Sequence, residues 1–282
     1  LANATTEGYS RQQVIVTDAF YSTRYGAYAN RLQIGKGTDI AEIRQVRNTF
    51  LDAQYRVQAG RQSFYEAQYK AVQEIEDLFG EMEGEEFITS VTDLWSAVSN
   101  LAQEPNNIVL RSELVSTASK FTERANALRD QLVEYQTNMN QEVKNQVDQI
   151  NDIVDQIRHY NELIQKYEAT GESANDYRDS RNLLLDQLST YVNVESYEEV
   201  DGTVSIYAEG QFLLESNVQR RLTTANESET SKLLKPVWEM GGDFFLRGEL
   251  SYSSENDTDT GSLRGLLVAR GKSKTTYLDI PQ

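Results

Sequence analysis

The chain has 282 residues, of which 44 are acidic and 27 are basic, so its formal net charge at pH 7 is −17. This excess of negative charge disfavours binding to nucleic acid, because the phosphate backbone would be repelled. No cysteine is present, which excludes disulfides, thiolate nucleophiles, zinc–cysteine sites and iron–sulfur clusters.

The first hundred residues predict short strands followed by helices. Residues 12–18 and 38–46 are typical of strands, and a tyrosine-rich excursion with glycine turns lies between them. A helical pattern runs from about residue 47 to residue 79. A shorter helix over residues 87–102 ends before Pro105.

A long helix is predicted next, because neither glycine nor proline occurs between Pro105 and Gly171. Its apolar residues recur at steps of three and four, a heptad stripe with a local stutter after Met139. At ~1.5 Å per residue the helix would be roughly 90 Å long. Companion helices must cover the stripe, either in an intramolecular bundle or in neighbouring subunits. The stripe consists of Leu110, Leu114, Ala118, Phe121, Ala125, Leu128, Leu132, Tyr135, Met139, Val143, Val147, Ile150, Val154, Ile157 and Ile164.

The remaining residues change from helical to alternating periodicity. One more helix is predicted over residues 176–190, and from Tyr191 onward apolar and polar residues alternate. The pair Asp201-Gly202 indicates a hairpin turn. Strand-like pieces follow at residues 204–208, 212–214, 219–223, 233–240 and 244–252, then a helical turn at 263–269 and a polar tail that favours a fragment of a longer chain.

The predicted fold class is therefore α+β and multidomain. An elongated bundle of long helices follows a short N-terminal β excursion and precedes a mainly antiparallel β domain. We expect a connector at residues 1–47, a helical bundle at 48–190, the β domain at 191–260 and a truncated return segment at 261–282.

The sequence offers no catalytic or cofactor-binding constellation. His159 is the single histidine, so the usual pairs of nucleophile and base are lacking. Residues 255–259 lack the ligand pattern of a calcium loop, and no metal or other cofactor is expected. No apolar run is long enough to span a bilayer and the start shows no signal peptide, which leaves cytoplasmic residence or export without cleavage.

Two asparagines on the long helix stand beside the apolar stripe. If Asn151 and Asn161 face the seam of the bundle, they fix the register of the helices, as a buried asparagine does in coiled coils. If they face water, they only lower helix propensity. Their position beside stripe residues favours the seam.

Several motifs in a fixed order carry a resemblance to a known family. The opening segment Asn3-Ala-Thr-Thr-Glu-Gly8-Tyr9-Ser10-Arg11-Gln12 resembles a segment of the flagellar rod, hook and hook-associated family. In that family this segment joins a terminal coiled coil to the first folded domain.

The resemblance continues along nearly the whole chain. Its further motifs contain Phe50, Gln54 and Arg56; then Pro105 and Arg111; then Asn151 and Asn161; then Asp179 and Arg181; and finally Gly202, Gly261 and Gly265. Two departures are Gln45, where an arginine is common, and Asn48, where the family has aspartate.

The resemblance implies a structural subunit of the bacterial flagellum, an adaptor between hook and filament that acts by packing and is not an enzyme. It implies contacts with the hook protein, a second junction protein and neighbouring copies of the same subunit. An export chaperone would bind through a C-terminus that this sequence lacks, and the location would be extracellular, with no membrane or nucleic-acid partner. The alternative is a coiled-coil adhesin or sensor whose β domain binds a ligand.

Overall fold

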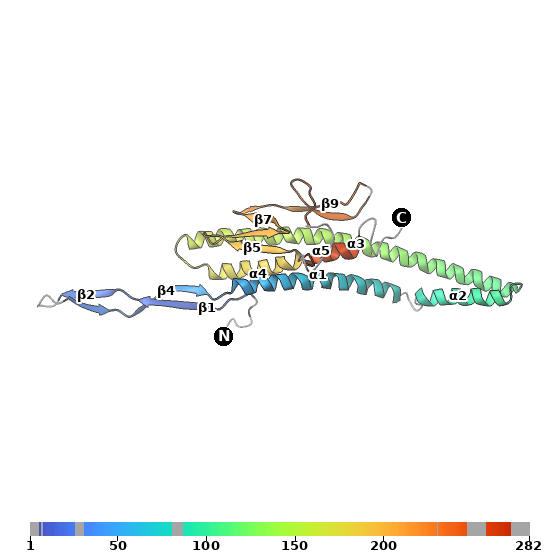
Figure 1. The fold of residues 1–282 in the computed structure, drawn as a ribbon, viewed down its shortest axis with the longest axis horizontal. Coiled ribbons are helices and arrows are strands. Elements are labelled where there is room, and N and C mark those ends of the chain that lie inside the picture. The colour runs from blue at the N-terminus through green and yellow to red at the C-terminus, as the bar shows by residue number, and fades with distance from the viewer. Residues whose placement is uncertain are drawn as a thin grey trace. The chain divides into compact units, whose positions relative to one another are not determined.

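The computed structural model describes residues 6, 8–25, 31–80, 87–229, 231–246 and 258–271, with helices and strands in the order shown in Figure 1. The chain divides into two compact units, and each unit is assembled from segments far apart in the sequence. The first unit comprises Leu1–Gln58, Asp152–Ser189 and Val194–Arg220, and the second comprises Ala59–Asn151, Thr190–Asn193 and Arg221–Gln282.

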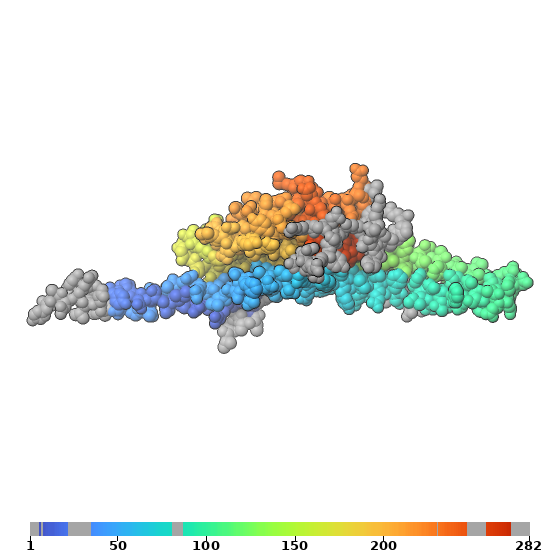
Figure 2. Space-filling view, in the orientation of Figure 1, coloured from blue at the N-terminus to red at the C-terminus, as the bar shows by residue number. Residues whose placement is uncertain are grey.

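The first unit begins with a two-stranded antiparallel ribbon. Strand β1 (Gln12–Asp18) pairs with β4 (Thr38–Gln45), and a bulge between Ile15 and Val16 shifts the register. Strands β2 (Tyr21–Tyr25) and β3 (Arg31–Gly35) form a second hairpin between them. The two strands predicted at 12–18 and 38–46 are confirmed. In Figure 2 the ribbon projects beyond the helices of its own unit.

Helix α1 (Thr49–Gly80) starts where Asn48 caps it. The side-chain Oδ1 of Asn48 accepts hydrogen bonds from the backbone N–H groups of Phe50 at 3.1 Å and Leu51 at 3.3 Å. These bonds satisfy two of the amides that a helix N-terminus leaves without partners. Asparagine and aspartate are about equally favoured as helix caps, so the departure at Asn48 leaves the cap intact.

The last part of α3 (Ile108–Glu168), helix α4 (Asn175–Tyr191) and a four-stranded sheet complete the first unit (Figure 1). The sheet is antiparallel in the order β5 (Val194–Glu198), β6 (Val204–Ala208), β7 (Gln211–Glu215) and β8 (Val218–Gln219). Its core is formed by fully buried apolar side chains of α3, α4 and the strands: Val154, Ile157, Ile164, Leu188, Ile206, Leu213 and Leu214.

The second unit contains the rest of α1, helix α2 (Phe87–Gln103) and the part of α3 that ends at Asn151. The ring of Phe87 on α2 lies 6.0 Å from that of Phe79 on α1 and 5.8 Å from that of Phe121 on α3. Aromatic side chains thus hold the start of α2 between the two longer helices.

A hairpin and a short helix cover the other side of α3 in this unit. Strand β9 (Leu222–Asn226) pairs with β10 (Leu234–Trp238), and helix α5 (Ser262–Arg270) follows. Gly265 allows α5 to pack closely on α1, because a Cβ atom there would lie 2.5 Å from the carbonyl oxygen of Phe64. Fully buried Val143, Val147, Ile150, Leu263 and Leu267 form the core of this unit with Phe64.

The structure confirms the predicted helices and the hairpin at Asp201-Gly202, where Gly202 has a φ of 81°. The apolar stripe of α3 is buried from Met139 (4% exposed) to Ile164 (0%). The prediction of one strand at residues 219–223 is wrong. The chain there separates into β8, which pairs with β7, and β9, which pairs with β10.

Some predictions fall on residues outside the described part of the chain. They concern the glycine turn within the tyrosine-rich excursion, most of the piece at 244–252 and the polar tail. Phe244, at the start of that piece, forms an isolated antiparallel bridge with Val237. The division at residues 47, 190 and 260 stays a prediction, and β5–β8 belong to the first unit whereas β9 and β10 belong to the second.

Candidate functional site

Two predicted asparagines on α3 bind the backbone of strands. In the first unit, Asn161 donates from Nδ2 to the carbonyl oxygen of Val204 and accepts at Oδ1 from its N–H, both at 3.0 Å. In the second unit, Asn151 makes the same pair of bonds with Leu222, at 2.8 and 2.9 Å. Both side chains are buried, as the seam prediction required. Their partners are strands, however, so the register they fix is that of helix against strand.

A third asparagine on α3 acts in the same way and was missed from the sequence. Asn140 accepts at Oδ1 from the N–H of Leu234 at 2.7 Å and donates to the carbonyl oxygen of Lys232 at 3.1 Å. The buried Arg270 of α5 also donates to Oδ1 of Asn140, at 2.9 Å. Asn140 precedes Asn151 by three helical turns and follows the stripe residue Met139, so its spacing was a usable signal.

Arg181 on α4 is one of the largest fully buried side chains, with 1% of its surface exposed. Its Nη1 donates to Oδ1 of Asn161 at 3.0 Å and to the carbonyl oxygen of Gly202 at 2.6 Å. Burial lowers the pKa of Arg181 to about 10, and the carboxylate of Glu198 acts in the opposite direction. The two family-motif residues Asn161 and Arg181 therefore join α3 and α4 to the turn that enters β6.

A neighbouring arginine carries two acidic partners. Arg178 binds Glu168 through two parallel contacts of 2.7 Å, and its Nη1 donates to Glu198. The hydrogen bonds that Arg178 donates to Glu168 hold the pKa of the Glu168 carboxyl below its ordinary value, and the same bonds raise the pKa of Arg178. Bidentate pairs of this kind are the stronger class of ion pair. Sequence reasoning missed this cluster, because its members lie up to 30 positions apart without a motif.

The N-terminal connector is tied to α4 within the first unit. The backbone N–H of Ser10 donates to Oδ2 of Asp179 at 3.2 Å. Gln45 donates to the carbonyl oxygen of Asn175 at 2.7 Å, and Asn175 donates back to the carbonyl oxygen of Ile43 at 2.8 Å. These bonds join the segment before β1 and the end of β4 to the first turns of α4.

The start of α1 is held by the same helix and the sheet. Arg56 is buried and donates to Oδ1 of Asp186 at 2.7 Å and to the hydroxyl of Ser196 at 2.9 Å. Arg47 donates to Asp52 and to the hydroxyl of Ser10. Asp186 was not singled out from the sequence, although it is the acceptor that a buried arginine requires.

Other predicted residues have local roles or lie at the surface. Arg111 donates twice to the carbonyl oxygen of Pro105, at 2.6 and 2.8 Å, and so closes the turn between α2 and α3. The carbonyl oxygen of Arg11 accepts a hydrogen bond from the N–H of Val46, and Gln12 is the first residue of β1. The side chains of Phe50 and Gln54 are exposed. Asn3 lies outside the described residues.

An apolar stripe runs along the solvent face of α2 in the second unit. Ile88, Val91, Trp95 and Val98 follow heptad spacing, and Trp95 is 73% exposed. This stripe is separate from the one that packs inward at Leu94 and Ala97. The part of α1 in this unit carries a similar outward set, namely Tyr65, Tyr69 and Val72. Exposed heptad stripes of this kind are typical of helices that pack on further helices.

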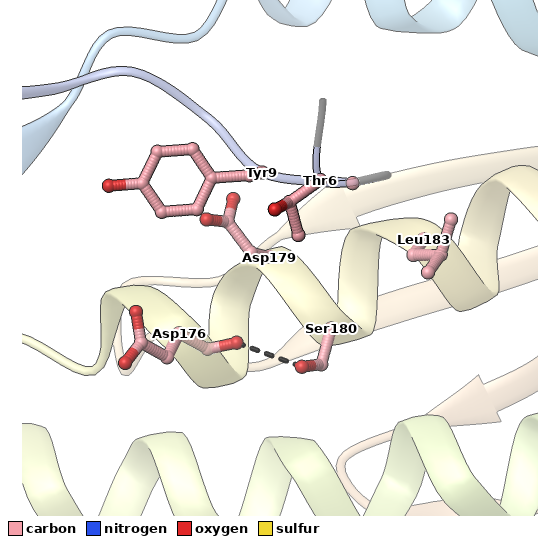
Figure 3. A pocket seen from close by; sticks show the side chains of 7 residues that line it. Thr6, Tyr9, Asp176, Asp179, Ser180 and Leu183 are labelled. Carbon is pink, nitrogen blue, oxygen red and sulfur yellow. Dashed lines mark hydrogen bonds between the residues drawn. The ribbon is translucent and has the colours of Figure 1, made fainter. Parts of the chain in front are cut away.

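A small pocket opens beside the connector in the first unit (Figure 3). Its volume is about 200 Å³. Thr6 and Tyr9 line one side, and the opposite side is a face of α4 with Leu183. The hydroxyl of Ser180 donates to the carbonyl oxygen of Asp176 at 2.9 Å. The lining includes Thr6, Tyr9, Asp176, Asp179, Ser180 and Leu183.

The described residues show neither a metal cluster nor a membrane-spanning helix. No three His, Cys, Asp or Glu side chains among them lie close enough together to hold a metal ion. None of the helices in the described ranges has the length and hydropathy to cross a bilayer. What the arrangement offers is a set of buried polar contacts that fix elements in register, and apolar faces that remain open.

The family model for the flagellar hook-associated protein FlgK helical domain matches residues 72–279. The chain belongs to this family. The match covers α2, α3, α4, α5 and strands β5–β10, which contain the asparagine contacts and the outward stripe of α2, whereas β1–β4 lie before it. The resemblance seen in the sequence motifs is thereby confirmed.

Similar proteins extend the match to almost the whole chain. Flagellar hook-associated protein 1 of Bacillus subtilis is 27% identical over 281 residues, which are 96% of this chain and 55% of that protein. Its counterpart in Salmonella typhimurium is 24% identical over 275 residues, 96% of this chain and 47% of that protein. The chain thus spans about half the length of the curated relatives it matches.

A solved structure shows the same fold. The flagellar hook junction protein FlgK from Burkholderia pseudomallei aligns with a TM-score of 0.60 at 23% identity, over 77% of this chain and 39% of that chain. The α+β fold class predicted from the sequence is confirmed, with long helices, an N-terminal ribbon and antiparallel strands.

Proposed function

We propose that this chain is the helical part of a structural subunit that joins the flagellar hook to the filament. Membership in the FlgK helical-domain family supports the proposal, and the relatives are named as hook-associated proteins. The subunit acts by packing and not by catalysis. Its location is the extracellular flagellum, which it reaches by export without a cleaved signal peptide.

The observation that carries the proposal is the outward apolar stripe of α2 and α1 in the second unit. A monomeric protein rarely exposes a row of large apolar side chains at heptad spacing. Trp95, at 73% exposure, and Ile88, at 66%, would each gain roughly 1.5–3 kcal/mol from complete burial. We infer that companion helices of the assembled flagellum cover this stripe.

The proposed partners follow from the family. They are the hook protein, a second junction protein and neighbouring copies of the same subunit. An export chaperone would engage the length that the relatives have beyond the span matched here. We also propose that the chain divides into connector, bundle, β domain and return segment, and that these parts make different contacts with the partners.

A chimera tests this function. The chain replaces the matching span of the Bacillus subtilis relative, and the chimera is expressed in a strain that lacks that relative. We expect filaments and swimming motility to be restored. Substituting Trp95→Asp should abolish filament attachment, because a charge would be buried in the companion interface.

A matched control is Ser96→Asp, which adds the same charge at an exposed polar position outside the stripe. It should assemble as the unmodified chimera does. Because Trp95 is mostly exposed, Trp95→Asp should change the free energy of unfolding of the isolated chain by less than about 0.5 kcal/mol. An exported, folded chimera that never attaches to hooks would contradict the junction role, and normal assembly of Trp95→Asp would contradict the packing surface.

A further inference from the structure

Asp179 combines deep burial with an unused acceptor. Only 7% of the residue is exposed. Its Oδ2 accepts from the N–H of Ser10 at 3.2 Å, but Oδ1 has no hydrogen-bond partner within the described part of the chain. A buried carboxylate oxygen without a donor is costly, so this oxygen would gain free energy by accepting a hydrogen bond from a bound group.

The side chain lies at a cavity that could admit such a donor. Figure 3 shows the carboxylate of Asp179 directed from α4 toward the segment that carries Thr6 and Tyr9. Gly8 in this segment has a φ of 77°, and a Cβ atom there would lie 3.2 Å from Cβ of Leu183. The glycine thus lets the connector approach α4 and form the cavity wall.

The walls of the pocket have the composition of a site for an organic cation. Two carboxylates, Asp176 and Asp179, contribute negative charge, and none of the described residues that line the pocket is basic. The ring of Tyr9 offers a π face, which attracts cations, and Leu183 offers an apolar surface for a hydrocarbon stem. A bare metal ion fits less well, since the described residues bring only two acidic side chains to the cavity.

We propose that this pocket binds an alkylguanidinium or alkylammonium group, the chemistry of an Arg or Lys side chain or of a free organic amine. The cationic head donates to Oδ1 of Asp179, and its stem lies along Leu183. Such a site goes beyond the proposed role at the junction, because it can exist whether or not the outward stripe of α2 makes contacts.

The test titrates the chain with n-butylguanidinium and n-butylammonium, with n-butanol as the neutral control. Backbone amide shifts in NMR spectra report binding at Ser10, Gly8 and Leu183. We expect both cations to shift these amides and butanol to have no effect. Asp179→Asn should weaken binding about tenfold or more, because a charge-assisted hydrogen bond is lost.

A stability measurement and two further variants, Asp176→Asn and Asp152→Asn, keep the test independent of folding. Asp179→Asn retains the acceptor for the N–H of Ser10, so thermal unfolding followed by circular dichroism should show an intact fold. If that variant is unstable, Asp176→Asn, at an exposed position of the pocket rim, should still weaken binding severalfold. Asp152→Asn removes an exposed acid elsewhere and should leave binding unchanged.

Sedimentation velocity then distinguishes the source of the cation. If the chain self-associates, and if both butylguanidinium and the Asp179→Asn substitution abolish this self-association, the cation in the pocket is a basic side chain of a second copy. If the small cations bind and the chain does not self-associate, the natural ligand of the pocket is a free organic cation. Equal shifts with butanol, no shift with either cation, or unchanged affinity in both pocket variants would overturn the proposal.

Discussion

The contacts of Asn161 predict a large loss of stability when its side chain is removed. Three hydrogen bonds of 3.0 Å converge on this residue, two with the backbone of Val204 and one with Arg181. In Asn161→Ala, the N–H and the carbonyl oxygen of Val204 lose their side-chain partner while they stay buried. Each unmet group costs about 1–3 kcal/mol, and Arg181 keeps its bond to Gly202.

The expected decrease in the free energy of unfolding is therefore about 3–5 kcal/mol, a large share of the stability of an ordinary domain. Urea unfolding followed by circular dichroism measures it. Hydrogen exchange at the amide of Val204 gives a local measurement, and this amide should exchange roughly a hundredfold faster or more in the variant. Asn161→Asp keeps an acceptor for the N–H of Val204 and adds a charge beside Arg181, so its loss should be smaller.

The control is Asn138→Ala on the exposed face of the same helix. Alanine has the higher helix propensity, so this variant should be unchanged or slightly more stable. A loss below about 1 kcal/mol in Asn161→Ala would refute the argument that the amide pair fixes the strand. Equal losses in both variants would assign the effect to the helix and not to the strand contact.

Two further outcomes follow from close packing and from an ion pair. Gly265→Ala should destabilise the chain by about 2–4 kcal/mol in urea unfolding, because the new Cβ atom would lie 2.5 Å from the carbonyl oxygen of Phe64. The control Gly80→Ala should be neutral, because a Cβ atom at Gly80 meets no atom within 4 Å. The pKa of Glu168 is lowered in the folded state by its bonds to Arg178, so this pair contributes stability above the ordinary pKa of 4.5 and loses it as pH falls through the lower folded pKa. Glu168→Gln should flatten that part of the stability profile between pH 6 and pH 3; an unchanged profile would contradict the assignment.

The long helix was predictable because its signal is local. Fifteen stripe residues repeat at helical spacing, and no glycine or proline interrupts them. Burial follows the same repeat from Met139 to Ile164, as expected for a face that meets other elements. The hairpin turn at Gly202 was also predictable, since it depends on one residue type at one position.

The partners of the polar residues were not predictable, because they depend on distant segments. Ser10 and Asp179 are 169 positions apart, and only the fold brings them to 3.2 Å. The separation of β8 from β9 also escaped the sequence, since neither glycine nor proline marks the break at Arg220. The family motifs contain Ser10, Asp179 and Arg181, but a motif does not indicate which residues these side chains contact.

The buried asparagines of α3 explain how a chain with long apolar stripes reaches a single arrangement. Apolar burial is non-directional, so a strand could slide along α3 by a helical turn with little change in buried area. The paired bonds of Asn151 to Leu222 and of Asn161 to Val204 cannot follow such a slide, since both backbone groups would lose their partners at once. The packing role proposed for this chain requires outward faces in fixed register, and these amide pairs supply the specificity that the stripe lacks.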